Sequence, residues 1–302
     1  MTPTGKSSIR LFRAGGIQVY LHWSWFMVAA FSVQYRAREY SSMLWNVLEY
    51  LSLFLLVLMH EFGHALACRQ TGGRADEIVL WPLGGVAYVA PPPRAGALLW
   101  SIAAGPLVNV VLLPVLAVIL IASNAAGVSA QFPNFHGLCR AVFNINAGLL
   151  IFNLLPIYPL DGGQIVRALL WFPFGRARSL KYASIVGFVG VAGVVLLAIM
   201  EQSLWMGIIA VFVFMNCRRG LLQAGALAQL EAAPRHAGFR CPSCKAAPRI
   251  GNFWRCGQCA TEFDTFETGA KCPLCGAGYP ITQCLDCGAT HSIDQWTAAA
   301  GG

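Results

Sequence analysis

The chain has 302 residues, of which 57% are hydrophobic and only 11% are charged, and its mean hydropathy is +0.59. These values exclude an ordinary soluble globular protein, in which about a quarter of the residues are charged. The apolar stretches reach roughly 20 residues, enough to cross a bilayer, so we expect a polytopic membrane protein. The net charge of +8 could suggest a nucleic-acid binder, but Lys and Arg also accumulate in the cytoplasmic loops of membrane proteins, which explains the excess first.

About six membrane spans are predicted in chain order, after a short basic segment at residues 1–16. A polar break at residues 69–94 separates the second span from the third. Its runs 78–80 and 86–89 are strand-like and flank Gly84-Gly85, which predicts a small β-hairpin or re-entrant loop. The expected spans cover about residues 17–34, 43–68, 95–123, 141–156, 183–200 and 203–216.

The distribution of basic residues predicts the orientation of the chain. With the N-terminus inside, twelve Lys and Arg residues of the spans and loops fall on the cytoplasmic side, and only Arg36, Arg38 and Arg140 fall outside. The positive-inside rule favours this arrangement. We therefore expect an integral protein of a bacterial or archaeal cell membrane with both termini in the cytoplasm.

A His-Glu-x-x-His pattern lies in the second span, at His60, Glu61 and His64, after a run from residue 51 to 59 without charge. On a helix, two histidines four residues apart share one face and can hold one Zn²⁺, and Glu61 is placed to take a proton from water. The alternative is a chance match of ordinary core residues. Burying three ionisable groups in a membrane helix is costly, which favours the metal site.

The third metal ligand is less certain from the residues alone. A catalytic zinc usually has three protein ligands, and the pattern supplies two. Cys68 lies one helical turn after His64, but would give an unusual ligand set. Asp161 is an isolated carboxylate on a helix broken by Pro and Gly, and is the stronger candidate. It is explained about equally well as the N-cap of the helix that restarts after Gly162.

Two segments together carry a family resemblance: the motif from His60 to His64 and the segment Asn-Leu-Leu-Pro-Ile-Tyr-Pro-Leu-Asp-Gly at residues 153–162. With shorter segments at 16–24, 82–86 and 104–109, they make the chain resemble the site-2 protease family of intramembrane zinc metalloproteases. The resemblance covers about residues 10–215 and fits the branch with six spans and no PDZ domain. It implies a zinc bound by His60, His64 and Asp161, Glu61 as general base, and Asn153 as a substrate or oxyanion contact.

The activity that the resemblance implies is cleavage of a transmembrane segment in another membrane protein, which would be the partner. Many relatives in this branch carry a pair of CBS domains at the C-terminus, and this chain does not, so regulation by adenine nucleotides is not carried over. One alternative is a catalytically silent membrane scaffold, and another is a membrane-tethered protein that binds nucleic acid or protein. The intact Glu61 favours the enzyme, because a scaffold does not need the base.

The tail contains eight of the eleven cysteines, arranged in four Cys-x-x-Cys pairs, which predicts two Cys₄ zinc sites. A reducing cytoplasm argues against disulfides. Short loops favour pairing the first with the second and the third with the fourth, rather than an interleaved pairing. With the catalytic ion this gives one catalytic and two structural zinc ions. The pairs are Cys241 with Cys244, Cys256 with Cys259, Cys272 with Cys275, and Cys284 with Cys287.

The partner of the tail is left open by the sequence. Phe239, Arg249, Trp254, Arg255 and Lys271 could contact nucleic acid. Acidic residues offset the basic ones, so a protein-docking or purely structural role is expected at least as much.

The predicted fold class is therefore an all-α polytopic membrane protein with a small β-hairpin or re-entrant element, followed by a small β-rich double zinc ribbon. The expected division is an intramembrane metalloprotease domain at 1–216, a linker at 217–238 and tandem zinc ribbons at 239–302.

Overall fold

A four-stranded sheet opens the fold in a computed structural model that describes residues 8–35, 40–81 and 84–298. The strands are β1 (Ser8–Ala14), β2 (Ile17–His22), β3 (Arg74–Trp81) and β4 (Gly84–Ala90), and they lie in the order β1-β2-β3-β4. The β1–β2 and β3–β4 pairs are antiparallel, which confirms the expected hairpin at β3 and β4. The β2–β3 pair is parallel, so the chain between these strands must cross over.

The first expected span differs from the structure. Residues 17–22 form β2 rather than the start of a membrane helix, and α1 (Ser24–Tyr35) has twelve residues. At 1.5 Å per residue this helix is about 18 Å long, short of the roughly 30 Å of a hydrocarbon core. A short apolar run does not distinguish strand from helix, which is why the sequence placed a helix here.

Five helices among the described residues are long and apolar enough to cross a membrane. A short helix, α4 (Val128–Gln131), lies between two of them. The second to sixth expected spans each overlap one of these helices, although the spans at 141–156 and 203–216 extend one or two residues beyond α5 and α7. The five are α2 (Met43–Gln70), α3 (Ala95–Ala125), α5 (Pro133–Leu154), α6 (Asp161–Met200) and α7 (Leu204–Ala232).

The last two membrane helices form a long antiparallel pair. Helix α6 is interrupted at Gly175, whose φ of 80° is not helical, so it consists of two arms. The second arm packs along α7, with Gly187 against Cys217 and Gly220 against Ser184. Helix α7 ends at Ala232, so most of the segment 217–238, which the sequence assigned to a linker, continues the helix.

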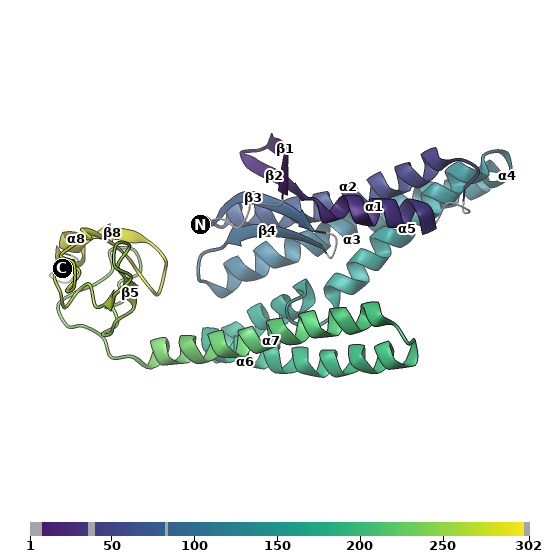
Figure 1. The fold of residues 1–302 in the computed structure, drawn as a ribbon. Helices are drawn as coiled ribbons and strands as arrows, with labels where there is room; N and C mark the ends of the chain where they lie inside the picture. The colour runs from purple at the N-terminus through teal and green to yellow at the C-terminus, as the bar shows by residue number, and fades with distance from the viewer. Residues whose placement is uncertain (1–7, 36–39, 82–83, 299–302) are drawn as a thin grey trace.

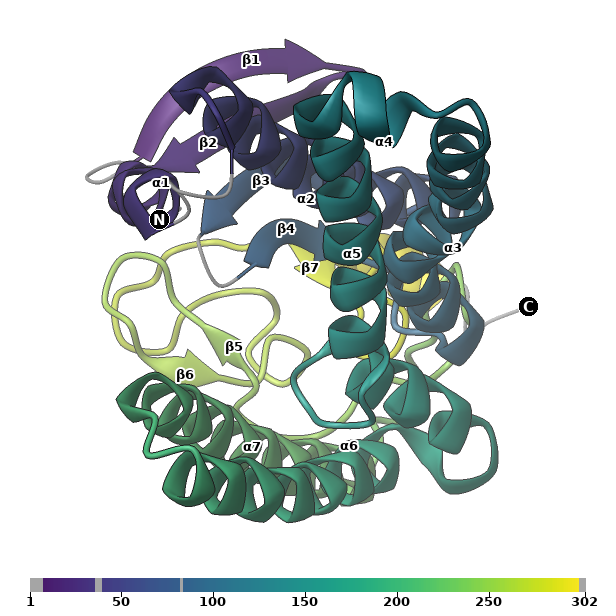
Figure 2. The same ribbon diagram turned by 90° about the vertical axis from the view of Figure 1, so that its right-hand side faces the viewer.

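The core joins the sheet to α2. Ile17, Val19, Ile78 and Leu80 of the two central strands are fully buried with Ala65 and Cys68 of α2. Figure 1 shows the sheet beside one end of α2 and α3, and Figure 2, which looks along the helices, shows the sheet and the pair of α6 and α7 on opposite sides. This packing fixes the helix that carries the His-Glu-x-x-His pattern.

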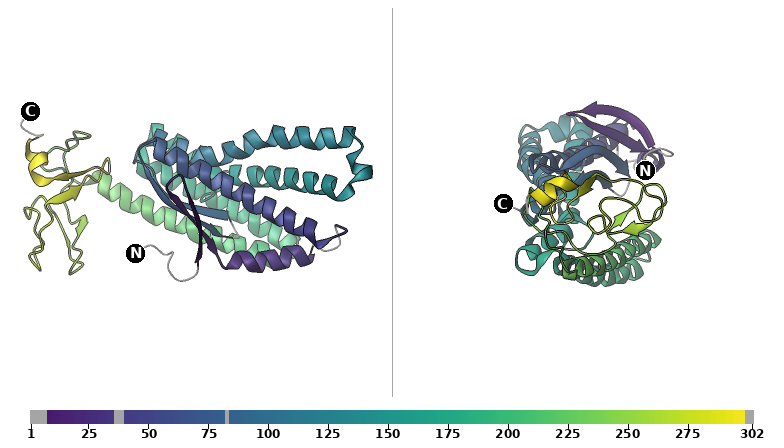
Figure 3. Two further views of the ribbon diagram at one scale, coloured as in Figure 1. Left: turned by 90° about the horizontal axis from the view of Figure 1, so that it is seen from above. Right: turned by 90° about the vertical axis from the view of Figure 1, so that its left-hand side faces the viewer.

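The cysteine tail, residues 239–298 of the described chain, continues from α7 at the end of the bundle where the sheet lies (Figure 3). It has two small hairpins and a short last helix, and its core is Phe266 and Trp296 with Cys241 and Cys284. The backbone amide of Arg240 donates to the carbonyl of Trp296 at 2.9 Å, so the start and the end of the tail meet. Its elements are β5 (Trp254–Arg255), β6 (Glu262–Phe263), β7 (Ile281–Gln283), β8 (Thr290–Ser292) and α8 (Ile293–Ala298).

Replacing Trp296 by Ala should loosen the tail, because the indole is 1% exposed and packs on Phe266 with ring centroids 4.9 Å apart. Loss of a buried Trp costs about 3–5 kcal/mol. Limited proteolysis of the full-length protein in detergent should then cut the tail at least about tenfold faster than in the wild type. Trp205→Ala, at an exposed position of α7, is the control. Equal cleavage rates in both variants would contradict the prediction.

Candidate metal centres

Three side chains converge between α2 and the start of α6. His60 Nε2 lies 3.1 Å from His64 Nε2 and 3.0 Å from Asp161 Oδ2, and His64 Nε2 lies 3.3 Å from the same carboxylate oxygen. His60 and His64 are 4% and 6% exposed. The two histidines come from consecutive turns of one helix and the carboxylate from another helix, 97 residues further along the chain from His64.

The tautomers of both histidines are fixed by their other ring nitrogens. His64 Nδ1 lies 2.9 Å from the carbonyl of Ser101, which can only accept, so Nδ1 carries the proton. His60 Nδ1 lies 2.7 Å from Asn109 Oδ1. The Asn109 amide is oriented by Asn146, to whose Oδ1 it donates at 2.8 Å, so Oδ1 accepts from His60. Both Nε2 atoms therefore present lone pairs.

Three acceptors so close together need a cation. Ligands around a tetrahedral zinc at 2.0–2.1 Å are about 3.3 Å apart, close to the three separations seen here. A His that donates its second ring N–H to a carbonyl or amide oxygen is the usual support of a metal ligand. The donor set and its geometry fit one zinc ion with an open fourth position.

Two glycines permit this convergence by allowing close approach of the backbone. A Cβ on Gly105 of α3 would lie 2.3 Å from the His64 ring, and one on Gly162 of α6 would lie 2.3 Å from the carbonyl oxygen of Leu154. Helix α3 also contains Pro106, which lacks an N–H and interrupts the hydrogen-bond ladder beside Ser101. The Gly-Pro and Asp-Gly pairs of the sequence thus serve the site directly.

Asp161, rather than Cys68, completes the group. Cys68 is buried with its Sγ 3.5 Å from the carbonyl of Arg74, among the residues that pack the sheet on α2. The N-cap of α6 is Leu160, so the capping interpretation of Asp161 does not hold. Glu61 follows His60 directly and is 5% exposed.

Asn153 stays a prediction. It is half-buried near the end of α5, and within the described ranges its side chain has no hydrogen bond. Two other asparagines, Asn109 and Asn146, are fully buried at the site. An amide side chain within an apolar helix is the feature of the sequence that could have identified both asparagines as residues of the site.

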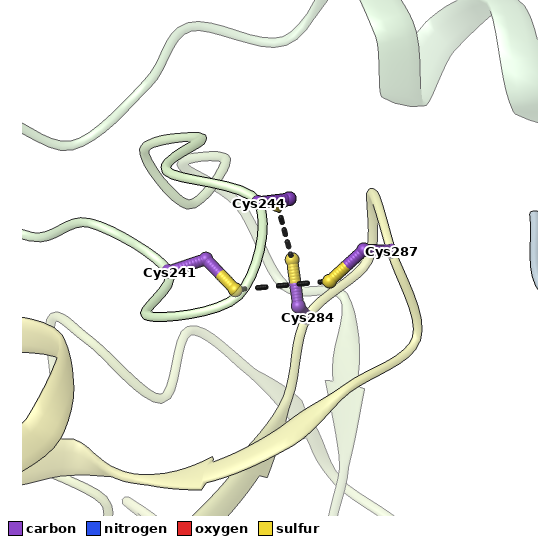
Figure 4. A group of neighbouring side chains, drawn as sticks. All are labelled: Cys241, Cys244, Cys284 and Cys287. Atoms are coloured by element: carbon purple, nitrogen blue, oxygen red, sulfur yellow. Dashed lines mark hydrogen bonds between the residues drawn. The ribbon is translucent and has the colours of Figure 1, made fainter.

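The eight cysteines of the tail form two further groups. Cys241, Cys244, Cys284 and Cys287 come together, as Figure 4 shows, and Cys256, Cys259, Cys272 and Cys275 form the second group. The Sγ–Sγ distances are 3.7 Å across the first group and 3.5 Å across the second. Thiolates around a tetrahedral zinc at 2.3 Å are about 3.8 Å apart, so both groups fit closed structural sites.

The expected sequential pairing is wrong: the first pair joins the fourth and the second joins the third. The prediction rested on loop length, but a loop three to four times longer costs only about 1 kcal/mol more to close. The aromatic core around Trp296 brings the two ends of the tail together and outweighs that cost. The sequence showed the aromatic residues but not their contacts.

Charged groups tie the tail to the last turn of α7. Arg249 donates to the carbonyl of Glu231 at 2.7 Å and to Asp286 at 2.9 Å, and Arg235 also pairs with Asp286. Burial raises the pKa of Asp286, but the two guanidinium groups outweigh it, so the pKa lies below its usual value. Arg249 is therefore already paired inside the protein, unlike a free nucleic-acid contact.

Two aromatic candidates for nucleic-acid contact are also engaged in packing. Phe239 and Trp254 both pack against the core around Trp296. Arg255 and Lys271 remain exposed. Whether the tail binds nucleic acid or protein stays open, as it does from the sequence alone.

Known proteins share the membrane part of this chain. Residues 49–197 match the model of peptidase family M50. A zinc metalloprotease of Methanocaldococcus jannaschii is 31% identical over 212 residues, which cover 70% of this chain and 60% of that protein. Stage IV sporulation protein FB of Bacillus subtilis is 33% identical over 139 residues, which cover 43% of this chain and 44% of that protein. The chain thus spans less than two thirds of both curated relatives.

A solved structure adds similarity of fold. The structure of a site-2 protease from Methanocaldococcus jannaschii matches with a TM-score of 0.50 and 28% identity, covering 71% of this chain and 95% of that chain.

Asn109→Ala should weaken zinc binding at the membrane site about 10–100-fold, because the amide orients His60 through its Nδ1. Competition with a chelator of known affinity, read by metal analysis of the purified protein, measures the effect. Asn144→Ala, at an exposed position of α5, is the matched control and should bind zinc as the wild type does. Unchanged affinity in Asn109→Ala would mean that the amide does not support the ligand.

Proposed function

We propose that the chain is an intramembrane zinc metalloendopeptidase of the site-2 protease kind, since residues 49–197 match the model of peptidase family M50. The observation that carries the proposal is the convergence of two histidine Nε2 atoms and one carboxylate oxygen inside the membrane helices, with Glu61 next to His60 in the sequence. The substrates are transmembrane segments of other membrane proteins, and the biological role is regulated intramembrane proteolysis.

The residues of the site divide the chemistry among them. A zinc ion bound here supplies Lewis-acid chemistry, polarising a peptide carbonyl and making water a stronger acid. His60, His64 and Asp161 would hold the ion. Glu61 takes a proton from the attacking water and delivers it to the leaving amine. The surrounding apolar helices restrict the access of water to the site.

The substrate must present an extended segment, because the peptide bonds of an intact helix are closed to attack. Strand β4 is an outer strand of the sheet and pairs with β3. Its free edge can accept an unwound substrate segment as an added strand, held by backbone hydrogen bonds. This gives the Gly84-Gly85 hairpin a role in substrate positioning.

The orientation follows the basic residues. The sheet and the cysteine tail lie at the same end of the helices (Figure 1). The sheet and the helix ends that adjoin it carry Arg10, Arg13, Arg69, Arg74 and Arg94, so we assign this end to the cytoplasm. There the tail cysteines stay reduced and hold two structural zinc ions.

A silent scaffold is the second candidate. The buried Glu61 has no use in a scaffold, and burying a carboxylate in a membrane helix is costly. Its presence beside three convergent ligands supports the enzyme.

Glu61→Gln should abolish cleavage and retain zinc, because the base is lost while the ligands remain. Removing a general base lowers the rate by about a hundredfold or more. The wild type and the variant, expressed in the same cells, are compared by quantitative mass spectrometry of membrane-protein fragments. Glu77→Gln on β3 is the control. Fragments at wild-type level in Glu61→Gln would remove Glu61 from the mechanism.

The purified protein should hold about three zinc ions per chain, one at the open site and one at each Cys₄ site. His60→Ala with His64→Ala should remove one, and removal of residues 235–302 should remove two. Inductively coupled plasma mass spectrometry on the three proteins gives the counts. A full-length count near one, with disulfides in the tail, would refute both the zinc sites of the tail and its cytoplasmic location.

A further inference from the structure

Two arginines lie on either side of the bend of α6, and neither forms an ion pair with a described residue. Arg167 is on the first arm of α6 and Arg176 begins the second arm, just after the break at Gly175. Both are half-buried, and the Nε of each is fully buried without a hydrogen-bond partner. Over the described ranges neither guanidinium group has an ion pair.

The positive charges of Arg167 and Arg176 repel one another. Arg176 and the Tyr158 hydroxyl both interact electrostatically with Arg167. Arg176 also lies over the ring of Trp171, 5.8 Å from the centroid, which holds its guanidinium group near the bend. Two like charges with buried, unsatisfied donors destabilise the bend unless an anion joins them.

Among the described residues no carboxylate pairs with either arginine. Between Gly162 and Ala232 the sequence has six Lys and Arg residues and two acidic residues, Glu201 and Glu231, and Glu231 is exposed on the last turn of α7. Glu201 follows the far end of the second arm, 25 residues after Arg176, or about 37 Å along a helix. Asp161 already belongs to the zinc site. Because neither Glu201 nor Glu231 forms an ion pair with the two arginines, and positive charge exceeds negative charge six to two in this segment, we look to another molecule for the counter-charge.

The surroundings of the pair indicate where that molecule lies. Phe172 and Phe174, between the two arginines, are exposed, as are Arg178 and Lys181 on the next turns. The antiparallel contacts of α6 with α7 bring this bend near the last turns of α7, at the end of the membrane helices. Exposed aromatic side chains beside basic ones at such a place are typical of the headgroup region.

We propose that Arg167 and Arg176 form a phosphate site at the bend of α6 that binds the headgroup of an anionic phospholipid. Each guanidinium group donates to phosphate oxygens, since its planar fork matches that geometry. The Tyr158 hydroxyl offers a further donor, and Phe172 and Phe174 lie along the acyl chains. Binding fixes the angle between the two arms of α6, of which the first begins with the zinc ligand Asp161. The proposal does not depend on protease activity.

The test measures lipid binding to the full-length protein by native mass spectrometry from detergent. The protein is titrated with phosphatidylglycerol, with phosphatidylcholine and with inorganic phosphate. Arg167→Gln with Arg176→Gln should weaken phosphatidylglycerol binding by about tenfold or more. The matched control, Arg178→Gln with Lys181→Gln, loses the same charge at exposed positions and should bind as the wild type does.

Several results would overturn the proposal. These are wild-type affinity in Arg167→Gln with Arg176→Gln, equal loss in the control pair, and equal affinity for phosphatidylcholine. Inorganic phosphate that binds as tightly as the lipid would assign the site to a soluble anion instead. If the Gln pair does not fold, Arg167→Lys with Arg176→Lys decides. The Lys pair keeps the positive charge but cannot donate two parallel hydrogen bonds to one phosphate. Its affinity for phosphatidylglycerol should therefore fall below that of the wild type.

Discussion

The convergence of three acceptor atoms at His60, His64 and Asp161 is the constraint on which the membrane domain depends. The atoms repel one another without a cation, so the fold must hold them together against that repulsion. It does so by fixing the far side of each ring, through the Ser101 carbonyl and the Asn109 amide. Helix α3 therefore has to approach α2 closely, which explains a glycine at position 105 better than any turn requirement does.

The same constraint organises the remaining helices. Asn146 of α5 orients Asn109 of α3, which orients His60 of α2, and α6 begins at the third ligand. Four helices thus meet in one hydrogen-bonded network, whose members would each be costly if left alone in an apolar interior. The side chains of Asn146, Asn109, His60, His64 and Asp161 form one connected set, and this is how a membrane interior tolerates them.

Much of this site was predictable because its residue types are distinctive. His60, Glu61 and His64 follow from spacing, and the strands at residues 78–80 and 86–89 follow from turn residues and branched side chains. The role of Asn109 was not predictable, because an asparagine in a membrane helix has no fixed partner until the helices are packed. The strand at residues 17–22 was missed because its parallel partner, β3, lies more than 50 residues away in the chain. The nested cysteine pairing was missed because loop length was weighed without the aromatic core that Trp296 provides.

The number of ligands distinguishes the two cysteine groups of the tail, which suit a structural role, from the three-residue group in the membrane helices, which suits catalysis. Each cysteine group supplies four thiolates, which complete a tetrahedron and leave no position for a substrate. The membrane group supplies three donors, so a fourth position remains open beside Glu61. Zinc bound at the tail sites would therefore contribute folding energy, whereas among the three groups of the described residues the membrane group is the one with a position left for a reacting molecule. Since the tail is joined to α7 through Arg249, and α7 packs along the second arm of α6, folding of the tail is coupled to the helix whose first arm begins with Asp161.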